Sequence, residues 1–100
     1  MSEKFKIHDR VKWSSQSAGR RTLKRGTVLA VVQDGHAVED ALGAVGKSLA
    51  DFALRTVEFG MVRNHTSYLV AVTRMTRGQP SKGRPVLYWP RARHLEEDSA

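Results

Sequence analysis

Two short apolar runs constrain the fold of this chain more than any other feature. VLAVV spans residues 28–32 and YLVAV spans residues 68–72. Both are far shorter than the roughly 20 residues that a membrane-spanning helix needs. Their continuous, largely β-branched character is typical of strands that are covered on both faces. We therefore expect two central strands, one over residues 27–32 and one over residues 66–74.

Further strands are expected on either side of these runs. Residues 5–13 alternate between a basic face and an apolar face that carries Phe5, Ile7, Val11 and Trp13. This alternation predicts a half-buried strand. Residues 14–25 are polar and lack an apolar period, which predicts a long exposed loop. A fourth strand is expected over residues 85–89, followed by a short turn and closing strand over 91–95.

The hydrophobic period changes between residues 36 and 57, where apolar side chains recur at steps of three and four. This pattern predicts an amphipathic helix between the second and third strands, with Asp34 capping its start. Gly43 and Gly46 weaken the middle of this helix. A break there is therefore an open alternative, with Ser48 and Asp51 capping a second short helix.

These elements together predict a mainly β, α+β fold: a small antiparallel barrel of about five strands with one inserted helix. The 100 residues suffice for one domain. We expect the barrel to comprise residues 4–33 and 62–95 and the helical insertion to comprise residues 36–58. The acidic tail, residues 96–100, is expected to fray.

The charge distribution favours a polyanionic partner. The net charge is +7, and no acidic residue lies between positions 61 and 95. That segment carries seven cationic side chains: Arg63, Arg74, Arg77, Lys82, Arg84, Arg91 and Arg93. Such segregation is typical of an electrostatic footprint for nucleic acid. The alternative is a basic surface that only keeps the protein soluble.

Composition also bears on the compartment. The chain has no cysteine, which excludes a disulfide framework and thiolate metal sites. The N-terminal MSEKFKIHDR has no apolar core, so it does not resemble a signal peptide. We expect a cytoplasmic protein with no membrane segment.

Residues 41–48, ALGAVGKS, match a loose phosphate-loop pattern. Such a loop must connect a strand directly to the start of a helix, and its enzymes need an acidic magnesium ligand after a later strand. Here the helical period already begins before residue 41, and no acid follows the 66–74 strand until Glu96. We expect a glycine-softened helix instead of a nucleotide site.

No other catalytic or metal-binding pattern stands out. The four histidines are His8, His36, His65 and His94, and their spacing is not that of metal ligands. No serine lies in a nucleophile motif, and residues 61–95 offer no acid to orient a histidine. We expect a protein that is not an enzyme and has no metal or cofactor.

The aromatic residues and one short loop have two interpretations each. Parity places Trp13 in the core and predicts that one of Tyr88 and Trp89 is more exposed. We expect this to be Trp89, because Pro90 and Arg91 follow it. An exposed cluster of Trp13, Tyr68, Tyr88 and Trp89 would stack on bases or enclose a methylated cation. The loop PSKGRP, residues 80–85, is similar to the core of an AT-hook, or it is a hairpin turn with solvated charges.

The segments HDRVKWSS, KRGTVLAVV, SYLVAV and LYWPRARHLE resemble the small SH3-like barrels of the Tudor and KOW kind. In those barrels a GD-x-V-x-W first strand and a G-x-V-x-x-V second strand precede two aromatic-rich strands and a closing turn. His8 stands where the leading glycine is usual. The chain also resembles uncharacterised small bacterial and phage proteins that end in YWPR. The resemblance implies binding of nucleic acid or a peptide, with the four aromatic residues as cage or stacking candidates.

The leading hypothesis is a non-enzymatic nucleic-acid-binding barrel, with DNA favoured over RNA. Two basic loops would grip the phosphate backbone through Arg20, Arg21, Lys24, Arg25, Arg74, Arg77, Lys82 and Arg84. The alternative is a protein-interaction module, such as a phage-borne inhibitor or accessory factor that binds an acidic protein surface. An exposed patch around Leu49 and Phe52 would favour that alternative. A methylated-peptide cage is a third possibility, and the oligomeric state is left open.

Overall fold

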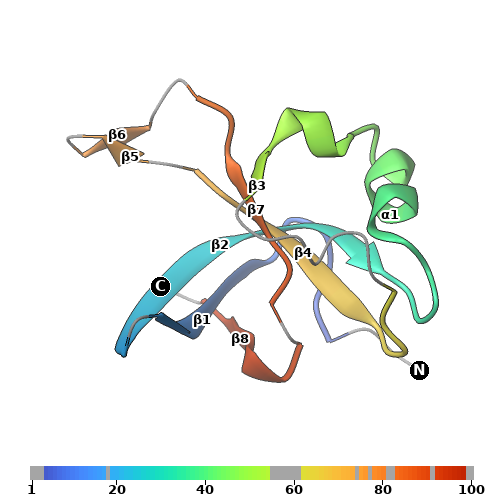
Figure 1. Cartoon of the computed structure of the whole chain (residues 1–100), viewed down its shortest axis with the longest axis horizontal. Coiled ribbons are helices and arrows are strands. Elements are labelled where there is room, and N and C mark those ends of the chain that lie inside the picture. The colour runs from blue at the N-terminus through green and yellow to red at the C-terminus, as the bar shows by residue number, and fades with distance from the viewer. Residues whose placement is uncertain are drawn as a thin grey trace.

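One six-stranded sheet organises the backbone of the computed structural model (Figure 1). The model describes residues 4–17, 19–54, 62–73, 75–76, 78–80, 83–90 and 92–98. The strand order is β3-β7-β4-β2-β1-β8, and every pair is antiparallel except β3 with β7. The six strands are β1 (Arg10–Ser17), β2 (Arg20–Val32), β3 (Ala53–Leu54), β4 (Ser67–Val72), β7 (Val86–Tyr88) and β8 (Glu96–Glu97).

The remaining elements are short. A separate small hairpin pairs β5 (Met75–Thr76) with β6 (Gln79–Pro80). The α-helix α1 spans Val38–Ala44, and two 3-10 turns, η1 and η3, span Leu49–Asp51 and Ala92–His94. A mainly β fold with one α-helix is therefore confirmed. Across the described residues, no helix is both long and apolar enough to cross a membrane.

Both faces of the sheet are covered. The helix-side core contains Ala30, Val32, Val38, Leu42, Phe52, Leu69, Leu87 and Trp89. The tail-side core contains Phe5, Val11, Trp13, Val28, Tyr68, Val70 and Leu95. The side chains of β4 alternate between the two cores, so both faces of this strand are buried, as the run YLVAV predicts. In β2, a shift of register between Val28 and Ala30 sends these two side chains to different cores.

The predicted loop over residues 14–25 is wrong. These residues form most of a long hairpin in which β1 and β2 pair from Arg10 opposite Thr27 to Ser17 opposite Arg20. Gly19 lies at the turn with a φ of +79°, a conformation that favours glycine. A hairpin with both faces near solvent needs no apolar period, which is why its sequence resembles a loop.

The predicted first strand begins too early. Residues 4–9 form a turn, and β1 starts at Arg10. His8 has a φ of +79°, and its backbone N–H donates to the Val28 carbonyl over 2.8 Å. The turn breaks the expected alternation, so Phe5 is buried in the tail-side core whereas Ile7 is 40 % exposed.

The single long helix is also wrong, and the broken alternative is confirmed. The helix α1 stops at Ala44, and the 3-10 turn η1 follows. Ser48 and Asp51 cap η1, since the Ser48 backbone N–H donates to the Asp51 carboxylate over 2.8 Å. The N-cap of α1 is Ala37 without a side-chain bond, so Asp34 does not cap it.

Residues 96–98 of the predicted acidic tail are described, whereas residues 99–100 lie outside the described residues. After η3, strand β8 pairs with β1, with Glu97 opposite Val11 and Glu96 opposite Lys12. The edge strands β3 and β8 do not pair with each other in the described part of the chain, so the sheet is open there. The acidic tail therefore lies beside the basic first hairpin.

Candidate functional site

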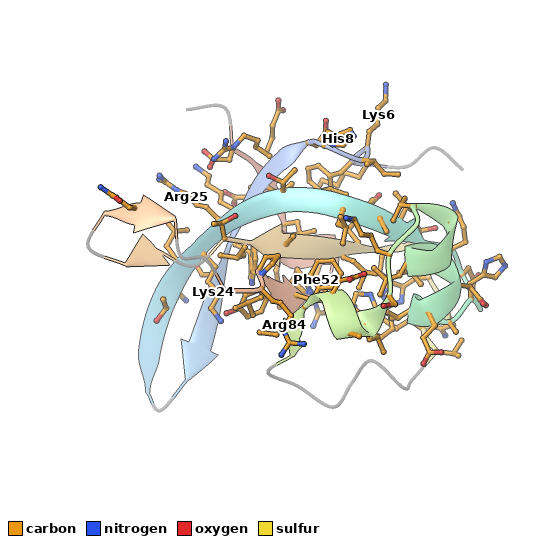
Figure 2. All side chains as sticks on the ribbon, turned by 90° about the horizontal axis from the view of Figure 1, so that it is seen from above. Lys6, His8, Lys24, Arg25, Phe52 and Arg84 are labelled. Carbon is orange, nitrogen blue, oxygen red and sulfur yellow. The ribbon has the colours of Figure 1, made fainter. Side chains whose placement is uncertain are left out.

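The outer part of the first hairpin is a two-stranded ribbon without further neighbours in the sheet. Among the described residues, β8 pairs only with positions 11–12 of β1, and β4 pairs with β2 only from Thr27 onward. Residues 13–17 and 20–24 therefore pair only with each other, and we call them the ribbon; Arg25 and Gly26 lie at its base, where their partners Lys12 and Val11 also pair with β8. The ribbon extends from the end of the sheet opposite α1 (Figures 1 and 2).

Cations dominate this hairpin. Residues 10–27 contain no acid and six basic side chains: Arg10, Lys12, Arg20, Arg21, Lys24 and Arg25. Arg21 and Arg25 are exposed, and they alternate with Leu23, which is 54 % exposed. Because side chains two residues apart share a face of a strand, these three lie on one side of β2.

Two residues of β1 complete this surface. Lys12 lies opposite Arg25 and Ser14 lies opposite Leu23, and directly opposed residues project to the same face. Val11 and Trp13 project to the other face, into the tail-side core. We call the surface made of Lys12, Ser14, Arg21, Leu23 and Arg25 the basic face.

The other side of the ribbon is anchored at its base. Trp13 is buried and meets Tyr88 edge to face, with ring centroids 5.6 Å apart. The Lys24 ammonium lies 4.4 Å from the centroid of the same Tyr88 ring. Lys24 is half-buried, so its cation–π contact ties β2 to β7. These contacts fix the direction in which the ribbon leaves the sheet.

The acidic tail partly neutralises the basic face at its edge. Arg25 Nε lies 3.8 Å from Asp98 Oδ2, and the Asp98 side chain is only 7 % exposed. The Asp98 backbone N–H donates to the Arg10 carbonyl over 2.9 Å, which holds the carboxylate in place. The site therefore includes a counter-charge as well as cations.

The second predicted basic loop is described only in part. Arg74, Arg77 and Lys82 lie outside the described residues. Arg84 is exposed, but its Nη1 donates to the Ala50 carbonyl over 2.9 Å, which links it to η1. The β5–β6 hairpin lies at the same end of the molecule as the ribbon, at the left of Figures 1 and 2.

The predicted aromatic cluster is not a cage. Trp89 is 4 % exposed, so its predicted exposure is wrong. Its indole N–H donates to the Ser67 hydroxyl over 2.7 Å, and Arg63 lies 3.8 Å over its ring. Tyr68 is buried in the tail-side core and accepts hydrogen bonds from the backbone N–H groups of Lys4 and Phe5. Trp13 and Tyr68 share that core, whereas Trp89 belongs to the helix-side core.

The segment ALGAVGKS is the end of a helix and not a phosphate loop. Lys47 N–H donates to the Leu42 carbonyl, and Gly46 N–H donates to the Gly43 carbonyl. This pair of bonds is the Schellman motif, in which backbone N–H groups satisfy the last carbonyls of a helix. These donors are therefore occupied, and the helix terminus carries the negative end of the dipole. An open hollow of about 440 Å³ lies beside Lys47 and Ser48, whose backbone N–H groups donate to the Leu42 carbonyl and the Asp51 carboxylate.

The described residues contain no group of three histidine or acidic side chains close enough to hold a metal ion. His8, His36, His65 and His94 are exposed. Sequence reasoning did not include Arg10, Lys12, Leu23 or Asp98 in the site. No local pattern marks Arg10, Lys12 or Leu23 as part of a binding strand, because residues 14–25 lack the period-two apolar alternation by which a strand is recognised.

No model of a known protein family matches this chain, and neither curated proteins nor solved structures give a match.

Proposed function

We propose that this protein is a non-enzymatic nucleic-acid-binding module that holds a phosphate backbone on the basic face of its first hairpin. One observation carries the proposal: six cations and no acid occupy residues 10–27, on a hairpin whose outer part is a ribbon free of other strands. Exposed cations on a projecting element can approach a polyanion without disturbing the core. Electrostatic attraction then supplies most of the affinity.

The frame we propose is a variant of the SH3-like barrel, with α1, η1 and β3 inserted between its second and third strands. The antiparallel order β8-β1-β2-β4-β7, with η3 before the closing strand, supports this proposal. His8 supports it as well, because its left-handed φ suits the glycine that stands at this position in the family pattern. In such a frame the β5–β6 hairpin and its flanking basic residues would form the second side of a clamp.

The alternative of protein binding through the helical segment has less support. Phe52 is 5 % exposed within the helix-side core, and Leu49 is half-buried against it. Among the described residues, these two side chains are thus largely covered and offer a partner little apolar surface. An acidic protein that binds the basic face instead would share the electrostatics of nucleic acid, so the experiment must separate the two.

A salt-titrated binding series tests the proposal. We expect duplex DNA, single-stranded DNA or RNA to bind at low salt, with log K falling against log salt at a slope of about −5 if about six phosphates are neutralised. Poly-glutamate of matched charge should compete weakly. A slope near zero, or competition by poly-glutamate equal to that by nucleic acid, would reject nucleic acid as the partner.

Charge-matched variants locate the surface. Arg21→Gln should weaken binding about five- to tenfold and reduce the salt slope by about 1, because Arg21 is exposed on the basic face. Lys47→Gln is the control, since Lys47 is exposed and follows α1 in the chain, and α1 lies at the other end of the sheet from the ribbon in Figure 1. Equal losses from both variants would mean that overall charge, and not this surface, drives binding.

A further inference from the structure

The geometry of the ribbon points to a more specific partner, and this inference depends on the proposed function. We propose that the ribbon enters the major groove of duplex DNA, with Arg21 and Leu23 facing the base edges and Arg25, at the base of the ribbon, facing the phosphate backbone. The partner is thus a B-form duplex and not a single strand or an RNA helix.

The dimensions of the ribbon match that groove. Its two strands pair only with each other over residues 13–17 and 20–24 in the described structure, so no third strand widens it there. Paired strands lie about 4.8 Å apart, and the major groove of B-DNA, about 12 Å wide, admits a two-stranded ribbon. The major groove of A-form RNA is deep and narrow, and side chains do not reach the bases through it.

The side chains of the basic face also match base edges. Arginine donates two hydrogen bonds to guanine O6 and N7, and apolar side chains contact the methyl group of thymine. Leu23 is the informative residue, because it is 54 % exposed between two arginines and belongs to neither core. Phosphate binding alone does not explain an exposed leucine at this position. Contact with thymine methyl groups does.

The ribbon is held in a fixed direction before it binds. Trp13 and Lys24 both contact Tyr88 at its base. At Gly26, where the ribbon joins the sheet, a Cβ atom would lie 2.6 Å from Val70 Cγ1, so β2 and β4 are in close contact there. A preorganised element loses little conformational entropy on binding. A partner can therefore be recognised by shape as well as by charge.

Two matched pairs of probes test the groove. The first pair is a duplex DNA and a duplex RNA of the same sequence, compared by fluorescence anisotropy at one salt concentration. The second is an A·T-rich DNA duplex with thymine or with uracil, which differ only in the major-groove methyl group. The affinity for each probe is measured with the wild-type chain and with Leu23→Ser. Because Leu23 is exposed, this substitution should leave the circular dichroism spectrum unchanged.

We expect duplex DNA to bind at least about tenfold more tightly than duplex RNA. Uracil should weaken binding by the wild-type chain about fourfold, the effect of one buried methyl group, and should not affect Leu23→Ser. Equal affinity for the DNA and RNA duplexes, or equal affinity for the thymine and uracil duplexes, overturns the groove assignment while the proposed function stands. If uracil weakens binding by Leu23→Ser as much as binding by the wild-type chain, Leu23 is not the residue that contacts the thymine methyl group. Absence of binding to every nucleic acid rejects the proposed function itself.

Discussion

The two halves of β2 belong to one strand and lie in opposite environments. Residues 27–32 lie against β4, and Val28, Ala30 and Val32 are buried there. In the described part of the chain, residues 20–26 pair with β1 alone, and Arg21, Leu23 and Arg25 are exposed. The difference comes from the neighbours and not from the strand itself. One continuous strand can thus stabilise the fold with one half and present a binding surface with the other.

The sharpest test of this comparison uses two leucines. Leu69 of β4 is fully buried in the helix-side core, and Leu69→Ala should lower the free energy of unfolding by about 3 kcal/mol. The matched variant Leu23→Ala removes the same atoms from an exposed position. It should change the free energy of unfolding by less than about 0.5 kcal/mol. Urea unfolding measures both. Similar losses in the two variants would show that the ribbon is part of the folded core.

The junction between the halves depends on a glycine. In Gly26→Ala the new Cβ would lie 2.6 Å from Val70 Cγ1 and 2.7 Å from the Ala71 carbonyl oxygen. The neighbouring backbone must shift to make room. We therefore expect Gly26→Ala to lower the free energy of unfolding by about 2 kcal/mol. Gly43→Ala is the control, because a Cβ there meets nothing within 4 Å. It should be neutral or slightly stabilising, and destabilisation equal to that of Gly26→Ala would contradict the close contact.

The turn before β1 stores strain that a substitution can relieve. His8 has a φ of +79°, which costs a residue with a Cβ atom about 1 to 2 kcal/mol relative to glycine. Glycine also has more conformational freedom in the unfolded chain, which offsets part of this gain. His8→Gly should therefore raise the free energy of unfolding by about 0.5 to 1 kcal/mol. Thermal unfolding checks this. His8→Ala keeps the Cβ atom and should give no such gain, so equal stabilisation by both variants would exclude relief of backbone strain.

The covered half of β2 was predictable from sequence, and the ribbon was not. Runs of apolar residues at 28–32 and 68–72 require burial on both faces, so they indicate central strands without further context. A ribbon in solvent leaves no burial pattern, and SSQSAGRRTLKR resembles a loop. Trp89 was assigned to the surface because its sequence neighbours are Pro90 and Arg91. Its burial depends on Ser67 and Arg63, more than 20 residues away, and no local pattern reports such contacts.

The smallest expected effect concerns the counter-charge at the edge of the basic face. Asp98 is held 3.8 Å from Arg25, where a phosphate would compete with it. Asp98→Asn keeps the shape of the side chain and removes its charge, so affinity for duplex DNA at low salt should rise about twofold. Asp34→Asn is the matched control, because Asp34 is exposed in the turn after β2, at the other end of that strand from the ribbon. Because screening weakens exposed charge pairs, the gain should shrink as salt is added. Equal gains from the two variants would show that Asp98 acts only through the net charge, and the acidic tail would then not tune the ribbon.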